Sequence, residues 1–168
     1  WLEIAREYGK LGKKDEELSA YQKYVKKDPQ NVEANVRLGK LLLEKKKYSE
    51  GMIYLETANT LQPNNLEIML PLARGYLATR RSSEAEVLLK KAKEIKPDDV
   101  GVRTMLISLY AHEGDNRKAI DEIEEVMKTH RDNELLFLYA KLLYEEGKTK
   151  DARDAIEVIR ATDPENID

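Results

Sequence analysis

The sequence predicts an all-α chain built from a row of similar helix pairs. Pro29, Pro63 and Pro97 each stand 34 residues from the next, and a fixed interval of this length is typical of helical repeats. Between them, apolar residues recur three and four positions apart, as on one face of a helix. A side chain able to cap a helix follows two residues after each proline and again one period later. These expected caps are Asn31, Asn65, Asp99 and Asn133.

An inner turn divides each unit into two helices. Gly12, Gly114 and Gly147 stand at this turn in three units, and glycine just past the last helical residue is a common helix end. In the third unit Arg80 takes the place of glycine. The expected caps of the helices that follow this turn are Ser82, Asn116 and Thr149.

Small and large residues occupy matching columns in successive units, as interlocking helices require. The first helices have a small column of Ala5, Gly39, Ala73 and Ala140 and a large column of Tyr8, Leu42, Tyr76, Tyr110 and Leu143. The second helices have a small column of Gly51, Ala85, Ala119 and Ala152 and a large column of Tyr21, Leu55, Leu89, Ile123 and Ile156. A small side chain in such a column lets two helices approach closely.

With these columns, the inner-turn glycines and the recurring prolines, the whole chain resembles a tetratricopeptide repeat array of about five repeats. The resemblance implies a right-handed α-solenoid, a superhelix of tandem antiparallel helix pairs whose first helices line a concave groove. We expect a single array over residues 1–168, excised from a longer chain. The expected repeats are 1–31, shortened at its start, 32–65, 66–99, 100–133 and 134–166.

Four residues depart from the small columns, and local packing is expected to widen around them. They are Glu17, Tyr24, Ile107 and Ile159. The fifth repeat is one residue short, because Gly147 follows Gly114 by 33 residues, and we place the missing residue between positions 133 and 139.

Pro71 falls inside the first helix of the third repeat. It has no N–H for the carbonyl of Glu67, at a cost of about 3 kcal/mol unless a neighbour compensates. We expect a kink there, and a hinge that senses a partner is the alternative.

Composition and charge exclude several classes of function. The chain has 29 basic and 32 acidic residues, so its net charge of -3 does not favour nucleic acid or an anionic membrane. It has no cysteine, which excludes disulfides, zinc–thiolate sites and a thiol nucleophile. No apolar run approaches the roughly 20 residues that span a bilayer. We therefore expect neither a nucleic-acid partner nor membrane insertion, and the cytoplasm and the periplasm fit equally well.

Enzyme motifs are incomplete. The tripeptide His130-Arg131-Asp132 matches the catalytic loop of protein kinases, but Asn133 and Phe137 stand where that loop needs leucine and asparagine. The stretch GKLGKK at residues 9–14 lacks the spacing of a phosphate-binding loop, and the two histidines lack the spacing of a zinc helix. We interpret the tripeptide as a turn and predict no enzyme, catalytic residue, cofactor or metal site.

A mostly basic column lies one residue beyond the small column of the first helices, next to a mostly apolar one. Together they predict a groove in which an extended peptide lays acidic or carbonyl groups on basic positions and small apolar side chains between them. A solvated charged face explains the same pattern without a partner. The predicted groove residues are Arg6, Lys40, Arg74, Lys141, Val36, Leu70, Phe137 and Tyr144.

The favoured function is a noncatalytic scaffold that binds a peptide or protein segment in its concave groove. The alternatives are a substrate-recruiting or assembly arm of a larger enzyme or of an envelope or secretion machine, and, ranked lower, an RNA-binding helical repeat. Some relatives clamp the C-terminal carboxylate of heat-shock chaperones. Here Arg6 and Arg37 stand in the asparagine columns of that clamp, and Leu2 and Pro71 in its basic columns, so chaperone-tail binding is not expected.

The two ends of the sequence suggest an excised array. Trp1 stands in an interior column of the first helix, and Pro164 begins a turn that would open another repeat. Ile156 and Ile159 on the last helix are expected to lack a covering repeat. End-to-end association of copies, or an exposed apolar patch, is the expected consequence.

Overall fold

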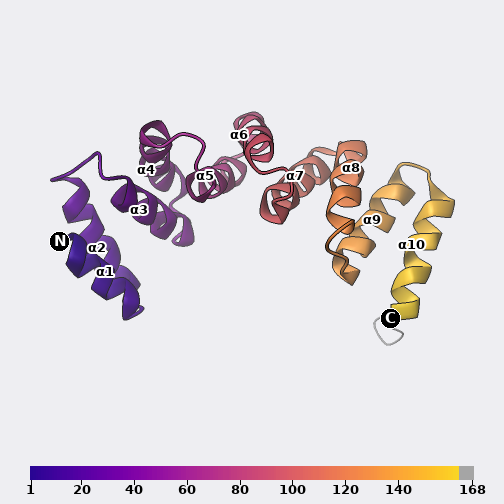
Figure 1. Ribbon diagram of the computed structural model, residues 1–168, viewed down its shortest axis with the longest axis horizontal. Helices are drawn as coiled ribbons and strands as arrows, with labels where there is room; N and C mark the ends of the chain where they lie inside the picture. Colours follow the sequence, from indigo (N-terminus) through magenta and orange to yellow (C-terminus); the bar gives the residue numbers. More distant parts are fainter. Residues whose placement is uncertain (163–168) are drawn as a thin grey trace. The chain divides into compact units, whose positions relative to one another are not determined.

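The computed structural model describes residues 1–162 and contains ten helices and no strand in that range (Figure 1). This confirms the all-α helical-repeat fold class, while the right-handed superhelical course and the single array of five repeats stay predictions. Each odd-numbered helix packs against the even-numbered helix that follows it. The helices are α1 (Leu2–Lys10), α2 (Lys14–Val25), α3 (Val32–Glu44), α4 (Tyr48–Leu61), α5 (Leu66–Ala78), α6 (Ser82–Ile95), α7 (Val100–Glu113), α8 (Asn116–Met127), α9 (Asn133–Glu145) and α10 (Thr149–Thr162).

The helices form two compact units. The first, Trp1–Ile95, holds α1 to α6, and the second begins at Lys96 and holds α7 to α10. Within the first unit, α2 packs on α3 and α4 on α5, and the first helices α3 and α5 also touch directly. Within the second unit, α8 packs on α9. The contact between α3 and α5 brings together the helices that carry the predicted basic residues of two neighbouring repeats, Lys40 and Arg74.

The predicted columns form the core. In the first unit Leu38, Leu42 and Leu55 are fully buried, and Ala5 is buried with them at a small column position. In the second unit Ile123 is equally inaccessible. Burying a leucine-sized side chain stabilises a fold by about 1.5–3 kcal/mol, so these positions supply much of the energy that holds each helix pair together.

Three of the predicted caps are confirmed. The side chain of Asn31 accepts a hydrogen bond from the backbone N–H of Ala34 at 3.0 Å. Asn65 accepts one from the N–H of Glu67 at 3.0 Å. Asp99 caps α7 in the same way. Each bond satisfies an N–H that the helix itself leaves free, which fixes where α3, α5 and α7 begin.

The cap predicted at Asn133 is wrong. Asp132 caps α9, accepting a hydrogen bond from the N–H of Leu135 at 2.7 Å, and Asn133 is the first helical residue. Asp132 follows the cap Asp99 by 33 residues, so the missing residue lies in the turn before α9 and not between 133 and 139. The aspartate of the kinase-like tripeptide therefore starts a helix.

Asn116 is also not a cap. Asp115 caps α8 and accepts a hydrogen bond from the N–H of Lys118 at 3.4 Å. Ser82 and Thr149 are the first residues of α6 and α10, one position beyond the cap. At α8 the two neighbouring residues Asp115 and Asn116 can both cap a helix, and the earlier one does so.

The inner turns require a left-handed backbone. Gly12, Gly114 and Gly147 have φ of 69°, 77° and 78°, as expected at a glycine helix end, but Lys46 and Arg80 adopt the same conformation, with φ of 60° and 59°. A side chain with a Cβ loses about 1–2 kcal/mol in this region of φ and ψ. Two of the five inner turns therefore carry local strain.

Replacing these two residues by glycine is expected to stabilise the chain. Lys46→Gly and Arg80→Gly should each raise the free energy of unfolding by about 0.5–1 kcal/mol, because relief of strain exceeds the extra entropy of glycine in the unfolded state. The midpoint of urea unfolding measures the gain. Asn64, with φ of 68°, is the matched control, because asparagine tolerates this backbone and Asn64→Gly should gain less. A loss of stability in both inner-turn variants would contradict the strain.

Glu17, which departs from its small column, is accommodated by two neighbours. Its side chain is buried and accepts two hydrogen bonds from the guanidinium of Arg37. The bond to Glu17 raises the pKa of Arg37. A Cβ on Gly9 would lie 2.9 Å from Glu17 Oε1, so the missing side chain of Gly9 leaves room for the carboxylate. Gly9 of α1 thus provides space for the larger side chain of Glu17, and Arg37 of α3 neutralises its charge.

The expectations for the ends are partly corrected. Ile159 is buried, with 7% of its surface exposed, and Ile156 is half-buried, so neither is fully uncovered. Trp1 is exposed and lies outside the core, with the ammonium of Lys23 4.7 Å from the centre of its ring. The turn expected at Pro164 lies outside the described residues.

Helix α5 runs without interruption from Leu66 to Ala78, through Pro71. The expected kink and its alternative, a hinge that senses a partner, both stay predictions. Along residues 1–162, no helix is long and apolar enough to cross a membrane.

Candidate peptide-binding groove

Two adjoining clefts lie between α3 and α5 in the first unit. The first, of about 410 Å³, is lined by Val36 and Lys40 of α3 and by Glu67 of α5. The second, of about 460 Å³, is lined by Lys40 and by Leu70 and Arg74 of α5. Lys40 and Glu67 border both, so the clefts form one continuous groove. The structure thus brings together four predicted groove residues, Val36, Lys40, Leu70 and Arg74.

The face that α5 turns to the groove follows from helical spacing. Glu67, Leu70, Pro71 and Arg74 lie three, four and seven positions apart, which places them in one stripe along the helix. The intervening Leu72 is buried in the core. The apolar surface of Leu70 therefore stands between the charged groups at either end of the stripe.

The groove contains two cations that have no ion-pair partner within residues 1–162. They are Lys40, which is half-buried, and Arg74, which is exposed. The nearby carboxylate of Glu44 is already taken, because Lys14 Nζ lies 2.6 Å from it. Glu67 supplies the remaining carboxylate at the groove wall. A half-buried cation such as Lys40 attracts an anionic group more strongly than a fully solvated one.

Arg6 stands in the same column as Lys40 and Arg74 but is engaged elsewhere. Its Nε donates a hydrogen bond of 2.7 Å to Glu33 of α3. This bond raises the pKa of Arg6 and lowers that of Glu33. Arg6 lines neither cleft, and its observed contact links α1 to α3. The proposed groove of the first unit therefore contains two of the three predicted basic positions.

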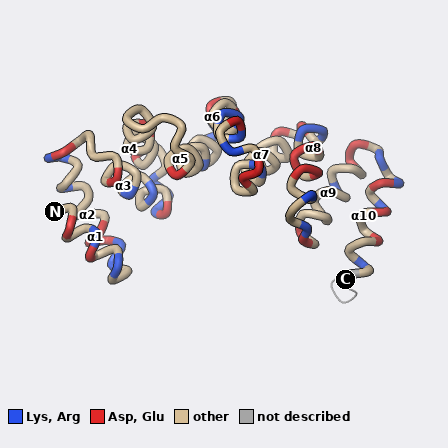
Figure 2. The backbone as a smooth tube through the Cα atoms, viewed as in Figure 1, with Lys and Arg blue, Asp and Glu red and all other residues tan. Residues whose placement is uncertain are grey.

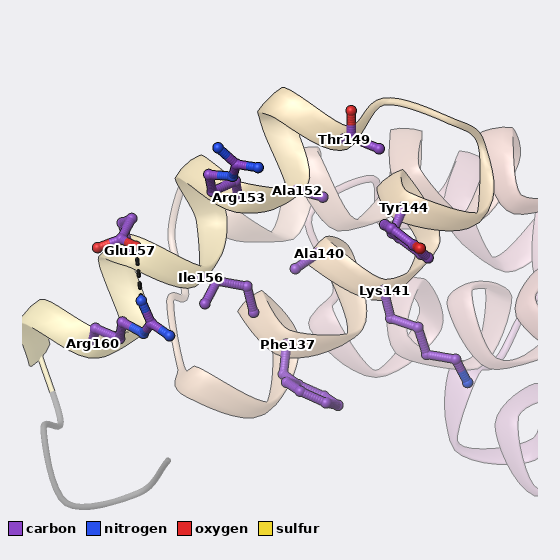
Figure 3. A pocket seen from close by; sticks show the side chains of 10 residues that line it. All are labelled: Phe137, Ala140, Lys141, Tyr144, Thr149, Ala152, Arg153, Ile156, Glu157 and Arg160. Atoms are coloured by element: carbon purple, nitrogen blue, oxygen red, sulfur yellow. Dashed lines mark hydrogen bonds and ion pairs between the residues drawn. The ribbon is translucent and has the colours of Figure 1, made fainter. Parts of the chain in front are cut away.

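The remaining predicted residues lie in the second unit, where a cleft of about 540 Å³ lies between α9 and α10 (Figure 3). Phe137, Lys141 and Tyr144 contribute to it from α9, and both aromatic side chains are largely exposed, at 61% and 68%. From α10, Ile156 points into the space between the two helices, toward Ala140. Aromatic side chains are enriched in surfaces that bind other proteins.

Several groove residues were not predicted as such. Tyr48 of α4, together with Glu67 and Pro71 of α5, borders the second cleft of the first unit. Arg153 and Arg160 of α10 border the cleft of the second unit, where Arg160 pairs with Glu157 at 3.0 Å (Figure 3). The spacing of Glu67 and Pro71 relative to Arg74 was a usable signal. The groove residues of α4 and α10 could not be predicted in this way, because the basic column runs along first helices only.

The kinase-like tripeptide forms a turn. His130 Nδ1 lies 2.9 Å from the hydroxyl of its neighbour Thr129, and Asp132 is bound to a backbone N–H as a cap. In the part of the chain that the structure describes, no three histidine or acidic side chains lie close enough to hold a metal ion. Basic and acidic residues are interspersed along the helices in both units (Figure 2).

Comparison with family profiles identifies the repeats. A profile described as tetratricopeptide repeat matches residues 2–65 and 104–167, and a second with the same description matches residues 48–109. The chain belongs to the tetratricopeptide repeat family. This confirms the resemblance drawn from the small columns and the recurring prolines. A comparison with curated proteins found no match.

Solved structures share the fold of this tetratricopeptide repeat protein at low sequence identity. A crystal structure of MamA protein is 20% identical with a TM-score of 0.85, covering 93% of this chain and 86% of that one. MamA residues 41 to the end from Desulfovibrio magneticus RS-1 are 15% identical, with a TM-score of 0.83 and coverage of 96% and 94%. TTC0263, a thermophilic TPR protein in Thermus thermophilus, is 20% identical, with a TM-score of 0.66 and coverage of 98% and 91%.

These likenesses establish the fold alone. Membership of the tetratricopeptide repeat family supports a protein-interaction scaffold in general terms, with protein partners, and suggests a repeat protein that is not itself an enzyme.

Proposed function

We propose that this tetratricopeptide repeat protein is a noncatalytic scaffold that holds an extended peptide segment in the groove lined by its first helices. The observation that carries the proposal is the continuous groove between α3 and α5, where Lys40 and Arg74 offer unpaired positive charge beside Val36 and Leu70. Charged donors orient a peptide backbone or side chain, and the apolar residues between them exclude water. The aromatic cleft between α9 and α10 is the corresponding candidate in the second unit.

The expected affinity is modest. Two hydrogen bonds to charged groups contribute about 1.5–3 kcal/mol each, and burial of a few small apolar side chains adds a similar amount. The cost of ordering the peptide offsets part of this gain, so we expect a Kd no tighter than micromolar, which corresponds to about 8 kcal/mol. Such an affinity suits a scaffold whose partners exchange, whether it acts alone or as the recruiting arm of a larger enzyme.

The proposal is tested by selecting binders from a random peptide library and mapping them on the 168-residue chain by the backbone amide shifts of its NMR spectrum. Shifts should concentrate on α3 and α5, around Val36, Lys40, Leu70 and Arg74, or on α9 around Phe137. Leu70→Glu should weaken the selected peptides about tenfold or more. Val87, an exposed apolar residue of α6 outside these clefts, gives the matched control Val87→Glu, which should leave binding unchanged.

Two results would contradict the proposal. Shifts confined to the exposed faces of the second helices would place binding elsewhere. Tight, salt-sensitive binding of single-stranded RNA, with no peptide selected, would favour the nucleic-acid alternative instead.

A further inference from the structure

Pro71 removes one backbone hydrogen bond from α5 at a position that borders the groove. Proline has no N–H, so the carbonyl of Glu67 lacks the donor that a helix normally supplies from four residues ahead. Helix α5 nevertheless continues through this point. Glu67 and Pro71, the two ends of the missing bond, both line the second cleft, so this stretch of backbone borders the groove. A hydrogen bond from a ligand N–H to this carbonyl would contribute favourably to the free energy of binding.

Lys40 and Arg74 set a second geometric condition. They occupy the same column in neighbouring repeats, on α3 and α5, and both line the cleft that contains Pro71. Packed helices lie about 8–10 Å apart, so we expect two anionic groups that bind these cations to be separated by a similar distance.

A polyproline II peptide meets both conditions. It has three residues per turn and rises about 3.1 Å per residue, so side chains three positions apart lie on the same side, about 9 Å from each other. Its backbone N–H groups make no internal hydrogen bonds, which leaves them available to an acceptor. A β-strand places same-side residues two positions apart, about 7 Å, which fits the helix spacing less well.

We propose that the groove of the first unit selects an acidic peptide in this conformation, with two carboxylates three positions apart bound by Lys40 and Arg74. An N–H of the intervening peptide backbone donates to the carbonyl of Glu67. This inference rests on the proposed function, since it names the partner chemistry of the same groove. Both cations lie at the groove without an ion-pair partner within the described chain, so the carboxylates of the ligand complement them.

The negative charge of Glu67 allows the charge of the ligand to be tested. Glu67 lines both clefts, as Lys40 does, so its negative charge repels an acidic ligand. Glu67→Gln removes this repulsion with little change of shape, and it should strengthen the binding of an acidic peptide about threefold. A groove that takes neutral or basic peptides would show no change or the opposite one.

The experiment uses blocked nine-residue peptides rich in proline and alanine, titrated into the 168-residue chain by calorimetry at low and moderate salt. The first carries glutamates three positions apart, the second has glutamines at the same places, and the third and fourth carry glutamates two and five positions apart. The first should bind at least about tenfold more tightly than the others, with an affinity that falls as salt rises.

Variants of the chain separate the three contacts. Lys40→Gln and Arg74→Gln should each weaken the first peptide about tenfold, while Lys91→Gln, an exposed lysine of α6, should leave it unchanged. Pro71→Ala restores the N–H for the Glu67 carbonyl, so it should raise the melting temperature of the protein and weaken the peptide about threefold. A gain in stability joined to a loss of binding cannot arise from misfolding.

The outcomes distinguish the inference from the proposed function. If selected peptides bind this groove without preference for the acidic pair or its spacing, the inference is wrong and the scaffold function stands. If the acidic pair binds but Pro71→Ala and Glu67→Gln leave its affinity unchanged, the assigned contacts are wrong. If no peptide binds the groove, both proposals fail.

Discussion

Gly39→Ala is expected to lower the free energy of unfolding of the first unit by about 1–2 kcal/mol. A Cβ on Gly39 would lie 2.6 Å from Leu55 Cγ and 2.9 Å from the carbonyl oxygen of Gly51. Leu55 is fully buried, and the Gly51 carbonyl belongs to the backbone of α4, so neither moves without separating α3 from α4. Overpacking in such a place costs about 1–3 kcal/mol, and rarely more. The better helix propensity of alanine returns only about 1 kcal/mol, and we expect the clash to dominate at this site.

The clash is reciprocal, which identifies its origin. A Cβ on Gly51 would lie 2.9 Å from the carbonyl oxygen of Gly39 and 3.1 Å from Leu42 Cβ. The third repeat has Ala73 and Ala85 in the same two columns. The second repeat therefore brings its two backbones closer than alanine permits, and Gly51→Ala should also destabilise.

Urea unfolding followed by far-UV circular dichroism measures both effects. Gly101, exposed in the first turn of α7, provides the control, since Gly101→Ala should not destabilise. If Gly39→Ala and Gly51→Ala were both as stable as the parent chain, the close approach would be wrong. Because α3 also carries Val36 and Lys40, forcing it away from α4 should disturb the groove as well, and peptide binding should weaken in the same variants.

The period and the columns were enough to predict most of the fold. The recurring prolines, the small columns and three caps all describe local interactions, and those recur with the sequence. The cap at Asp132 was missed because Asn133 is equally competent, and a repeat one residue short offers two alignments that only the backbone decides. The burial of Glu17 was not predictable from its column, because its partner Arg37 comes from the next repeat.

The groove shows the same division between local and nonlocal information. The column of Lys40 and Arg74 was visible at helical spacing, and the structure places both residues at one cleft. Arg6 has the same column position but is bound to Glu33, 27 residues away, on a neighbouring helix. A column describes which way a side chain leaves its helix. It does not describe what the adjoining helix presents to it.

The buried ion pair of the second unit carries the other large prediction. Arg103 Nη1 donates to Glu122 Oε2 at 2.6 Å, and Arg103 Nε donates to the carbonyl of Pro97 at 2.9 Å. Arg103 and Glu122 are only 8% and 7% exposed. Arg103→Met removes the guanidinium that pairs with this buried carboxylate, so we expect a loss of about 3–5 kcal/mol in the free energy of unfolding.

The chain itself supplies the compensating variant. The third repeat has Met69 and Leu88 at the places of Arg103 and Glu122. The double variant Arg103→Met, Glu122→Leu copies that apolar pair and should return to within about 1 kcal/mol of the parent, because a buried pair replaced as a whole is often neutral. The remaining deficit is the lost hydrogen bond to Pro97.

Chemical unfolding of the parent chain, of the single variants Arg103→Met and Glu122→Leu, and of the double variant completes the cycle, with Arg117→Met as the control. Arg117 is largely exposed and pairs with Glu146 at 3.0 Å, and exposed pairs contribute at most about 1 kcal/mol. A double variant as unstable as Arg103→Met would show that the loss comes from packing and not from the buried charge.

Comparison with the second repeat distinguishes the two interactions of Arg103, the ion pair with Glu122 and the hydrogen bond to the carbonyl of Pro97. There Asn35 occupies the same column, and its Nδ2 donates to the carbonyl of Pro29 at 2.8 Å and to that of Asn31 at 2.9 Å. The neutral amide of Asn35 thus stabilises the turn by hydrogen bonds alone, without an ion pair. Arg103→Asn should keep the bond to Pro97 while losing the charge opposite Glu122, so it should remain nearly as unstable as Arg103→Met. If Arg103→Asn instead recovered more than half of the stability lost in Arg103→Met, the hydrogen bond to the turn would be the main contribution of this position.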